Sequence, residues 1–270
     1  MRAKAYRLRG SGRLYERAAD DGPLRPLWHV AGATTFFAGP LRYNAGHQHG
    51  APVFLAGLYG DFRLRVRSEA WTTCRTAMIP AGCVHELDLG GDPLGVLYLE
   101  PDRFGVEALA PLLHGTRTVA GALLGAAGET TPLRDLFEHR DGTSAAGPAL
   151  ADLLAFAGRR TDPRIDGRIA RAIHRLLAEP DATPSAGALA ASVGLSASRF
   201  QHLFTDAVGV PFRRYRAWLR MRRAIGAVID GNNFTGAAHA AGFADQAHFA
   251  HDFRRTFGAP ASLSLRDIRR

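Results

Sequence analysis

Long apolar runs, cysteine and lysine are all scarce in this sequence. No stretch of about 18 consecutive apolar residues occurs, so no segment predicts a membrane span. The N-terminal stretch MRAKAYRLRGSGRLYERAADD has charge but no apolar core, which argues against a secretory signal. The two cysteines, Cys74 and Cys83, are too few for a disulfide framework and fit a reducing compartment. We therefore expect a cytoplasmic protein.

Signatures of catalysis are missing as well. The sequence contains no phosphate-cradling Gly-Lys-Ser/Thr loop and no Gly-x-Gly-x-x-Gly dinucleotide motif. It also contains neither the His-Glu-x-x-His motif of zinc proteases nor the Gly-x-Ser-x-Gly motif of hydrolases. We therefore assign no catalytic residue and do not expect an enzyme.

The charge of the chain is unevenly distributed and is carried by arginine. The 270 residues include one lysine, and the formal net charge is +9. Residues 159–270 contain 18 arginines against nine acidic residues, whereas residues 1–158 contain 16 basic and 16 acidic residues. The whole excess therefore lies in the last part of the chain. Such an asymmetry predicts a polyanion as partner, the alternative being a solvated arginine-rich surface.

The first hundred residues predict a β domain. They contain short apolar runs broken by Gly, Pro and Asp: TTFFAGPL, PVFLAGLYG, DFRLRVRS, TAMIPAG, HELDL and LGVLYLEP. Many short strands at close spacing are typical of a small barrel. From about residue 103 the pattern changes to helix, and GRRTDPR (158–164) has the composition of a linker. We therefore predict two domains, 1–158 and 159–270, the first a β-barrel with trailing helices and the second all-α.

Two segments of the second domain, 188–211 and 237–260, resemble each other. Matching positions are Ala190 with Ala238, Gly194 with Gly242, Phe200 with Phe249, Phe204 with Phe253, Gly209 with Gly258, and Pro211 with Pro260. Each segment predicts a short helix, a glycine turn and a capped second helix that ends at a Gly-x-Pro sequence. This is the helix-turn-helix arrangement, in which the second helix enters the major groove of DNA. We place the two units at about 185–209 and 234–258.

A long helix is expected between the two units. About 20 residues at 1.5 Å each span about 30 Å, close to the roughly 34 Å that separates successive major grooves on one side of B-DNA. A rigid connector of this length would let both second helices dock in adjacent grooves of one site.

The last hundred residues resemble the AraC/XylS family of bacterial transcription regulators. The stretch GFADQAHFAHDFRRTFGAP is similar to the signature of that family's second helix-turn-helix. The resemblance implies a DNA-binding transcription regulator, usually an activator, which contacts RNA polymerase. It also implies an effector-binding domain in front, commonly cupin-like. Which genes and which effector are involved does not follow from it.

In each unit the phenylalanines are expected to be core and the opposite helix face is left for DNA. By face and by resemblance, the predicted DNA-binding residues are Ser198, Arg199, Gln201, His202, Thr205, Gln246, Ala247, His248, His251, Arg254 and Arg255. Gln suits adenine, while Arg and the histidine N–H suit guanine. Arg255 and the arginines of the long helix are expected to face phosphates; the latter are Arg213, Arg214, Arg216, Arg220, Arg222 and Arg223.

The front domain contains a possible ligand cluster of histidines. His47 and His49 stand two apart, so on a strand they share a face, and His85 lies in a later Pro-x-Gly-x-x-His stretch. This pattern resembles a cupin, although Val53 and Phe54 stand where a metal-binding cupin has glutamate. Three interpretations remain open: a transition-metal site, the lining of an effector pocket, and structural residues. Cys83 is a fourth ligand or, more simply, a buried thiol.

Two further alternatives concern the whole chain. A metal-dependent cupin enzyme or a metal sensor fused to a DNA-binding domain is the rival to an effector-controlled regulator, and the missing carboxylate argues against the enzyme. The leucine-bearing helices between about 103 and 158 are candidates for homodimerisation or for packing on the barrel.

Overall fold

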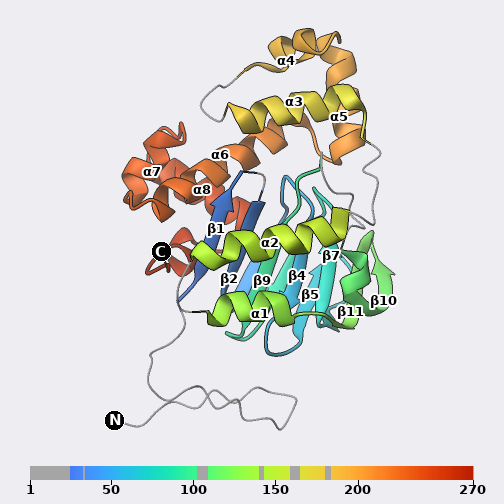
Figure 1. Ribbon diagram of the computed structural model, residues 1–270, viewed down its shortest axis with the longest axis vertical. Coiled ribbons are helices and arrows are strands. Elements are labelled where there is room, and N and C mark those ends of the chain that lie inside the picture. The colour runs from blue at the N-terminus through green and yellow to red at the C-terminus, as the bar shows by residue number, and fades with distance from the viewer. Residues whose placement is uncertain are drawn as a thin grey trace.

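A computed structural model describes residues 25–32, 34–101, 109–139, 143–158, 165–179 and 184–269. Figure 1 shows a β domain with two helices laid across one face of its sheet and a second, helical part beside it. The boundary expected at 158/159 falls on residues 159–164, which lie outside the described residues.

Two antiparallel sheets form the β domain. The larger sheet has the order β1-β2-β9-β4-β7-β11-β10 and the smaller one the order β3-β8-β5-β6. The strands of the larger sheet are β1 (Leu27–Ala31), β2 (Thr34–Pro40), β9 (Pro93–Tyr98), β4 (Val53–Gly57), β7 (Thr76–Ile79), β11 (Ala122–Gly128) and β10 (Leu113–Val119). Those of the smaller sheet are β3 (Tyr43–His47), β8 (His85–Asp88), β5 (Phe62–Val66) and β6 (Thr72–Cys74).

The apolar runs of the sequence form strands as predicted. In β5 the side chains of Phe62, Leu64 and Val66 are buried while Arg63 is exposed, so the alternation of the sequence follows the two faces of the sheet. Strand β4 is buried along its whole length, as expected of a strand between two neighbours with both faces covered. The cupin-like β domain expected from the sequence is confirmed.

The helix expected from about residue 103 is wrong over 113–128. After a short 3₁₀ turn (η1, Ala110–Leu112), β10 and β11 pair as an antiparallel hairpin. Ala120 and Gly121 join them with φ of +46° and +90°, the left-handed pair that a tight hairpin turn requires. The alternation Thr-Arg-Thr-Val in β10 is a strand pattern that the neighbouring leucines obscured. Residues 102–108 lie outside the described part of the chain.

The trailing helices pack on the sheet. Helices α1 (Thr131–Glu138) and α2 (Thr143–Gly158) contact each other and the strands β1, β2 and β9. Their buried side chains, among them Leu133, Phe137 and Leu150, join the core on that face. The position across the sheet is visible in Figure 1. Packing on the barrel, one of the two roles expected for this segment, is therefore what these residues do.

Helices make up the C-terminal part. They are α3 (Gly167–Ala178), α4 (Ala186–Ser192), α5 (Ala197–Val208), α6 (Phe212–Ile229), α7 (Phe234–Ala240), α8 (Gln246–Phe257) and α9 (Ala261–Ser264). Helix α6 lies between the group α3–α5 and the pair α7–α8 (Figure 1). Among the described helices none combines the length and the apolar character needed to cross a membrane.

Candidate nucleic-acid interface and histidine cluster

Two helix pairs of the same design flank α6. In each pair a side chain just before the helix accepts a hydrogen bond from a free backbone amide of the first turn; these caps are Ser185, Ser196, Asn233 and Asp245. The turn glycines Gly194 and Gly242 have φ of +71° and +76°, a conformation that a β-carbon disfavours. The repeat seen in the sequence is therefore a repeat of structure, with α4 and α5 as one unit and α7 and α8 as the other.

The aromatic residues of the repeat form the core of each unit. Phe249, Phe253 and Phe257 are buried on one side of α8, with successive ring centroids 5.8 and 4.4 Å apart. Phe200 and Phe204 occupy the equivalent side of α5. Burying a side chain of this size contributes about 1.5–3 kcal/mol. The cores fix the orientation of both second helices, and their opposite faces are left to solvent.

The predicted DNA-binding side chains lie on those opposite faces. Exposed on α5 are Ser198, Arg199, Gln201, His202 and Thr205, and exposed on α8 are Gln246, Ala247, His251, Arg254 and Arg255. Their exposure leaves them accessible to a large partner, and their contact with DNA stays a prediction.

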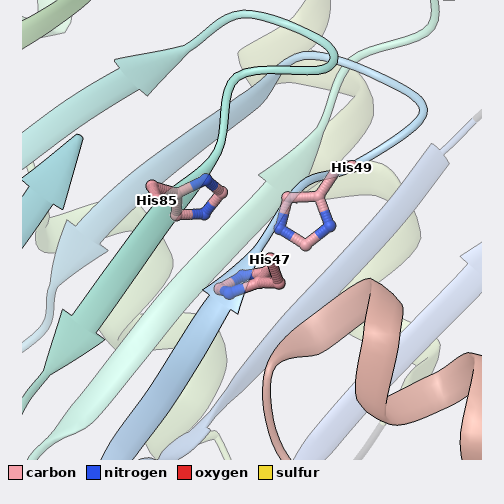
Figure 2. Close-up of side chains that lie close together, drawn as sticks. All are labelled: His47, His49 and His85. Carbon is pink, nitrogen blue, oxygen red and sulfur yellow. The ribbon is translucent and has the colours of Figure 1, made fainter. Parts of the chain in front are cut away.

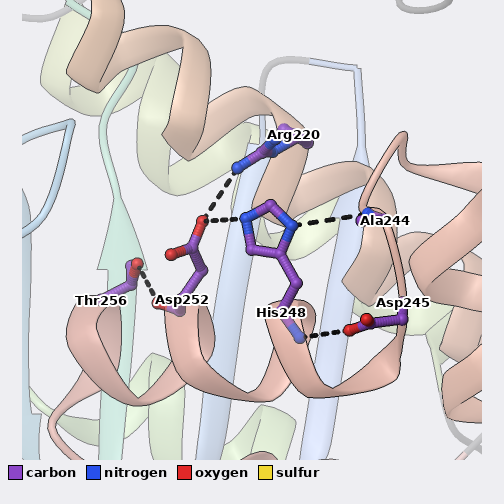
Figure 3. Close-up of polar contacts among 6 residues, drawn as sticks. All are labelled: Arg220, Ala244, Asp245, His248, Asp252 and Thr256. Atoms are coloured by element: carbon purple, nitrogen blue, oxygen red, sulfur yellow. Dashed lines mark hydrogen bonds and ion pairs between the residues drawn. The ribbon is translucent and has the colours of Figure 1, made fainter.

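His248 differs from the other predicted contacts because a polar network holds it. Its Nε2 lies 3.6 Å from the carboxylate of Asp252, and its Nδ1 accepts from the amide of Ala244 at 3.4 Å (Figure 3). Arg220 of α6 donates to the same carboxylate at 2.8 Å and lies 4.2 Å from the ring centroid of Phe243. Asp252 therefore ties α8 to α6, and His248, half-buried, is suited to positioning the helix as much as to reading a base.

Helix α6 has two unlike faces. One face lines an open groove between the two units, together with Gln201 and Thr205 of α5 and Gly242 of the second turn. The arginines that line the groove are Arg213, Arg216, Arg220, Arg222 and Arg223. The groove therefore extends from the polar face of α5 along α6 to the turn of the second unit. Arg214 is half-buried.

Arg222 corrects the expectation that the arginines of α6 face phosphates. It is 5% exposed and points into the β domain. There it donates to Glu100 at 2.9 Å, to Thr35 Oγ1 at 2.6 Å and to the carbonyl of Gly32 at 2.7 Å. Tyr215 donates to the same Glu100 carboxylate at 2.7 Å. The reason is the helical period, since positions 215, 218 and 222 share the stripe of α6 that packs on the barrel.

More contacts join the two parts of the chain. The indole of Trp218 stacks on Tyr98, with centroids 4.5 Å apart and planes at 29°. Trp28 Nε1 donates to the carbonyl of Ser264 at 3.0 Å, and the amide of Arg269 donates to the carbonyl of Pro26 at 2.9 Å. Sequence reasoning did not foresee this interface. Its one signal was the acidic Glu100 directly after the apolar run LGVLYL.

The three predicted histidines do converge. His47 ends β3, His49 follows in the next turn and His85 begins β8, and all three are buried (Figure 2). Their ligand atoms all lie within 4.8 Å of one another, and this is the one such group of His, Cys, Asp and Glu found in the described ranges. Neither a carboxylate nor Cys83 belongs to it. Of the two interpretations of Cys83, a fourth ligand is therefore not supported; its thiol is buried and free, as the simpler interpretation has it.

Electrostatics keep this cluster neutral. Burial, and then the neighbouring His85, hold the pKa of His47 well below its usual value, and burial with both neighbours does the same to the pKa of His49. Burial lowers the pKa of His85 to about 4. At neutral pH all three rings are therefore uncharged, and each has a nitrogen lone pair available to a ligand.

A cavity of about 30 Å³ adjoins the cluster. It is lined by His47, His49, Tyr98 and Asn44 from the β domain and by Phe257 from α8, among others. Such a volume has room for a water molecule or an ion and for nothing much larger. The cluster therefore lies between the two parts of the chain.

Comparison with known proteins covers both parts. The helix-turn-helix domain family matches residues 189–266. Apo ToxT from Vibrio cholerae, a variant protein, has 14% identity and a TM-score of 0.59, covering 88% of this chain and 98% of that one. Wild-type ToxT bound to an unsaturated fatty acid has 14% identity and a TM-score of 0.57, covering 88% of this chain and 96% of that one. Among curated proteins none matches.

These matches confirm the resemblance seen in the sequence. At such low identity the likeness to ToxT concerns the fold, and it extends over both the β domain and the helices. Residues 189–266 form a helix-turn-helix domain, and the chain joins it to an N-terminal β domain in the two-domain architecture of ToxT.

Proposed function

We propose that this protein is a sequence-specific DNA-binding transcription regulator controlled by a small-molecule effector. Residues 159–270 would bind DNA, and residues 1–158 would bind the effector. The observation that carries the proposal is the pair of helix-turn-helix units with exposed polar helices on either side of one arginine-lined groove. The charge supports it, because the net excess of +9 resides in the same segment.

The connector supports binding of both units to one site. Helix α6 has 18 residues, which at 1.5 Å per residue is about 27 Å. The Arg220–Asp252 pair braces the second unit against this helix. A short connecting helix that is fixed to the second unit favours docking of α5 and α8 in adjacent major grooves, with α6 crossing the DNA backbone between them.

Control by an effector would act through the contact between the two parts. ToxT has been seen with an unsaturated fatty acid bound. In this chain the cavity beside the histidines holds about 30 Å³, so an organic effector needs more space than the docked arrangement offers. Because α8 and α9 form one side of that cavity, an effector would favour an arrangement with these helices displaced. Unequal affinity for the two arrangements is what would change DNA binding.

Other parts of the proposal follow the family resemblance. We place the regulator in the bacterial cytoplasm, where its DNA lies, and expect activation through contact with RNA polymerase. A homodimer would need a surface other than the buried sides of α1 and α2, which pack on the sheet. We prefer a regulator to a cupin enzyme because, among the described residues, no carboxylate lies with the three histidines in the candidate ligand group.

The test is selection of bound sites from random DNA by the full chain. We expect an enriched sequence, and we expect His251→Ala to change its preference at one position, by about 1–3 kcal/mol, because this side chain is exposed on α8. Arg213→Ala should weaken binding to enriched and random DNA alike. The matched control is Arg117→Ala, an exposed arginine of β10. Failure to enrich any sequence would refute the proposal.

A further inference from the structure

We propose that His47, His49 and His85 bind one divalent transition-metal ion, and that the docked DNA-binding domain closes this site. Occupancy of the site and docking of α6 and α8 would then stabilise each other. The first half stands on the cluster alone. The second half rests on the proposed function, since it makes metal occupancy a means of regulating the DNA-binding domain.

The spacing of the cluster is close to what an ion requires. The three ligand atoms lie within 4.8 Å of one another. Nitrogens bound to one tetrahedral zinc at about 2.0–2.1 Å lie about 3.4 Å apart, so modest ring rotations would bring them to an ion. Imidazole ligands without carboxylates favour zinc, copper, nickel or cobalt over magnesium or calcium.

Hydrogen bonds orient two of the rings as ligands. His47 Nδ1 lies 2.8 Å from the carbonyl of Ala45, and His85 Nδ1 lies 3.0 Å from the carbonyl of Cys83. A carbonyl can only accept, so each Nδ1 carries the proton and each Nε2 keeps its lone pair. Donation of the second ring nitrogen to a carbonyl is the arrangement that metal-bound histidines almost always have.

Two ring nitrogens of the histidine cluster lack a hydrogen-bond partner in the part of the chain that the structure describes. His85 Nε2 and His49 Nδ1 are buried and, within the described residues, have no hydrogen-bond partner. The oxygen Asn44 Oδ1, which is in the same condition, belongs to a residue lining the adjoining cavity. Buried polar atoms normally have partners, so several without one around a small space call for a bound species. An ion would take the nitrogen lone pairs, and a water beside it would donate to Asn44.

The end of α8 covers the cluster. The side chain of Asn44 donates to the carbonyl of Phe257 at 2.7 Å, and the amide of Ala45 donates to the carbonyl of Gly258 at 3.0 Å. The Phe257 ring lies 5.7 Å from His49. At Gly258 the fit is so close that an added β-carbon would lie 2.7 Å from His47 Nδ1. An ion could therefore leave on this side only if the end of α8 moved away from β3.

The first experiment is a zinc titration of the full chain, stripped with a chelator, against a competing chromophoric chelator. We expect one zinc per chain. His49→Gln and His85→Gln should each weaken affinity by at least about 100-fold, whereas His114→Gln, an exposed histidine of β10, should leave it unchanged. Unfolding curves establish that the variants are folded. Sub-stoichiometric uptake by the wild-type chain, which requires no variant, would overturn the metal site.

The second experiment tests closure by the rate at which zinc passes to an excess of chelator. The variant Arg222→Ala breaks a buried ion pair between the two parts but changes none of the three histidines. We expect its release to be at least about tenfold faster, because opening limits escape. Equal rates would overturn closure by the DNA-binding domain. DNA binding by the metal-free chain is measured separately, so that failure of the proposed function is distinguishable from failure of the site.

Discussion

Replacing Arg222 by alanine tests what holds the two parts of the chain together. The substitution removes three hydrogen bonds and leaves the carboxylate of Glu100, 1% exposed, without the guanidinium. Removing one partner of a buried ion pair costs about 3–5 kcal/mol. In a protein of this size 1 kcal/mol lowers the Tm by about 2–4 °C, so we expect a fall of about 6–20 °C.

Thermal unfolding and a salt titration of DNA affinity measure the effect. Arg222→Ala should lower the Tm while the slope of log affinity against log salt stays as in the wild type. The control Arg213→Ala, exposed on the groove side of α6, should leave the Tm unchanged and reduce the slope by about 0.9. An unchanged Tm with a reduced slope for Arg222→Ala would mean that this side chain meets DNA after all. The double variant Arg222→Met with Glu100→Leu should regain most of the lost stability.

Three further substitutions test the helix-turn-helix units. Phe253→Ala should cost about 3–5 kcal/mol in urea unfolding, since the ring is 1% exposed; a cost below 1 kcal/mol would contradict its role as core. Asp245→Ala should cost about 1 kcal/mol through loss of the cap of α8, and Asp245→Asn should restore it. Gly194→Ala should cost about 1–2 kcal/mol because its φ is +71°, and equal stability would refute the strain.

The parts of the fold that could be predicted are those whose sequence pattern depends only on residues close together in the chain. Strand β5 could be predicted because its alternation is local. The two units could be predicted because the spacing of phenylalanines, glycines and caps is local and is repeated. The hairpin β10–β11 was not foreseen, because the Gly- and Ala-rich sequence of β11 has neither a strand nor a helix period, and pairing with β7 stabilises this strand.

For the candidate sites, the sequence predicted which residues take part, but it did not predict which other elements pack around them. The histidine cluster could be predicted from spacing, since residues two apart on a strand share a face. The burial of Arg222 could not, because an arginine-rich helix does not reveal which of its sides packs on another domain. The network around His248 could not be predicted for a similar reason, since Arg220 is far from it in sequence and reaches it only across two packed helices.

A hydroxyl-radical footprint of the full chain on a selected DNA site tests most directly whether one protein reads two adjacent grooves. We expect two protected patches on the same side of the duplex, separated by about 10–10.5 base pairs, because α6, about 27 Å long, joins the two units and is close in length to the roughly 34 Å of one turn of DNA. Replacing Gln201 and Thr205 by alanine together should remove one patch and leave the other. A single patch in the wild-type footprint, or two patches on opposite sides of the duplex, would contradict this reading.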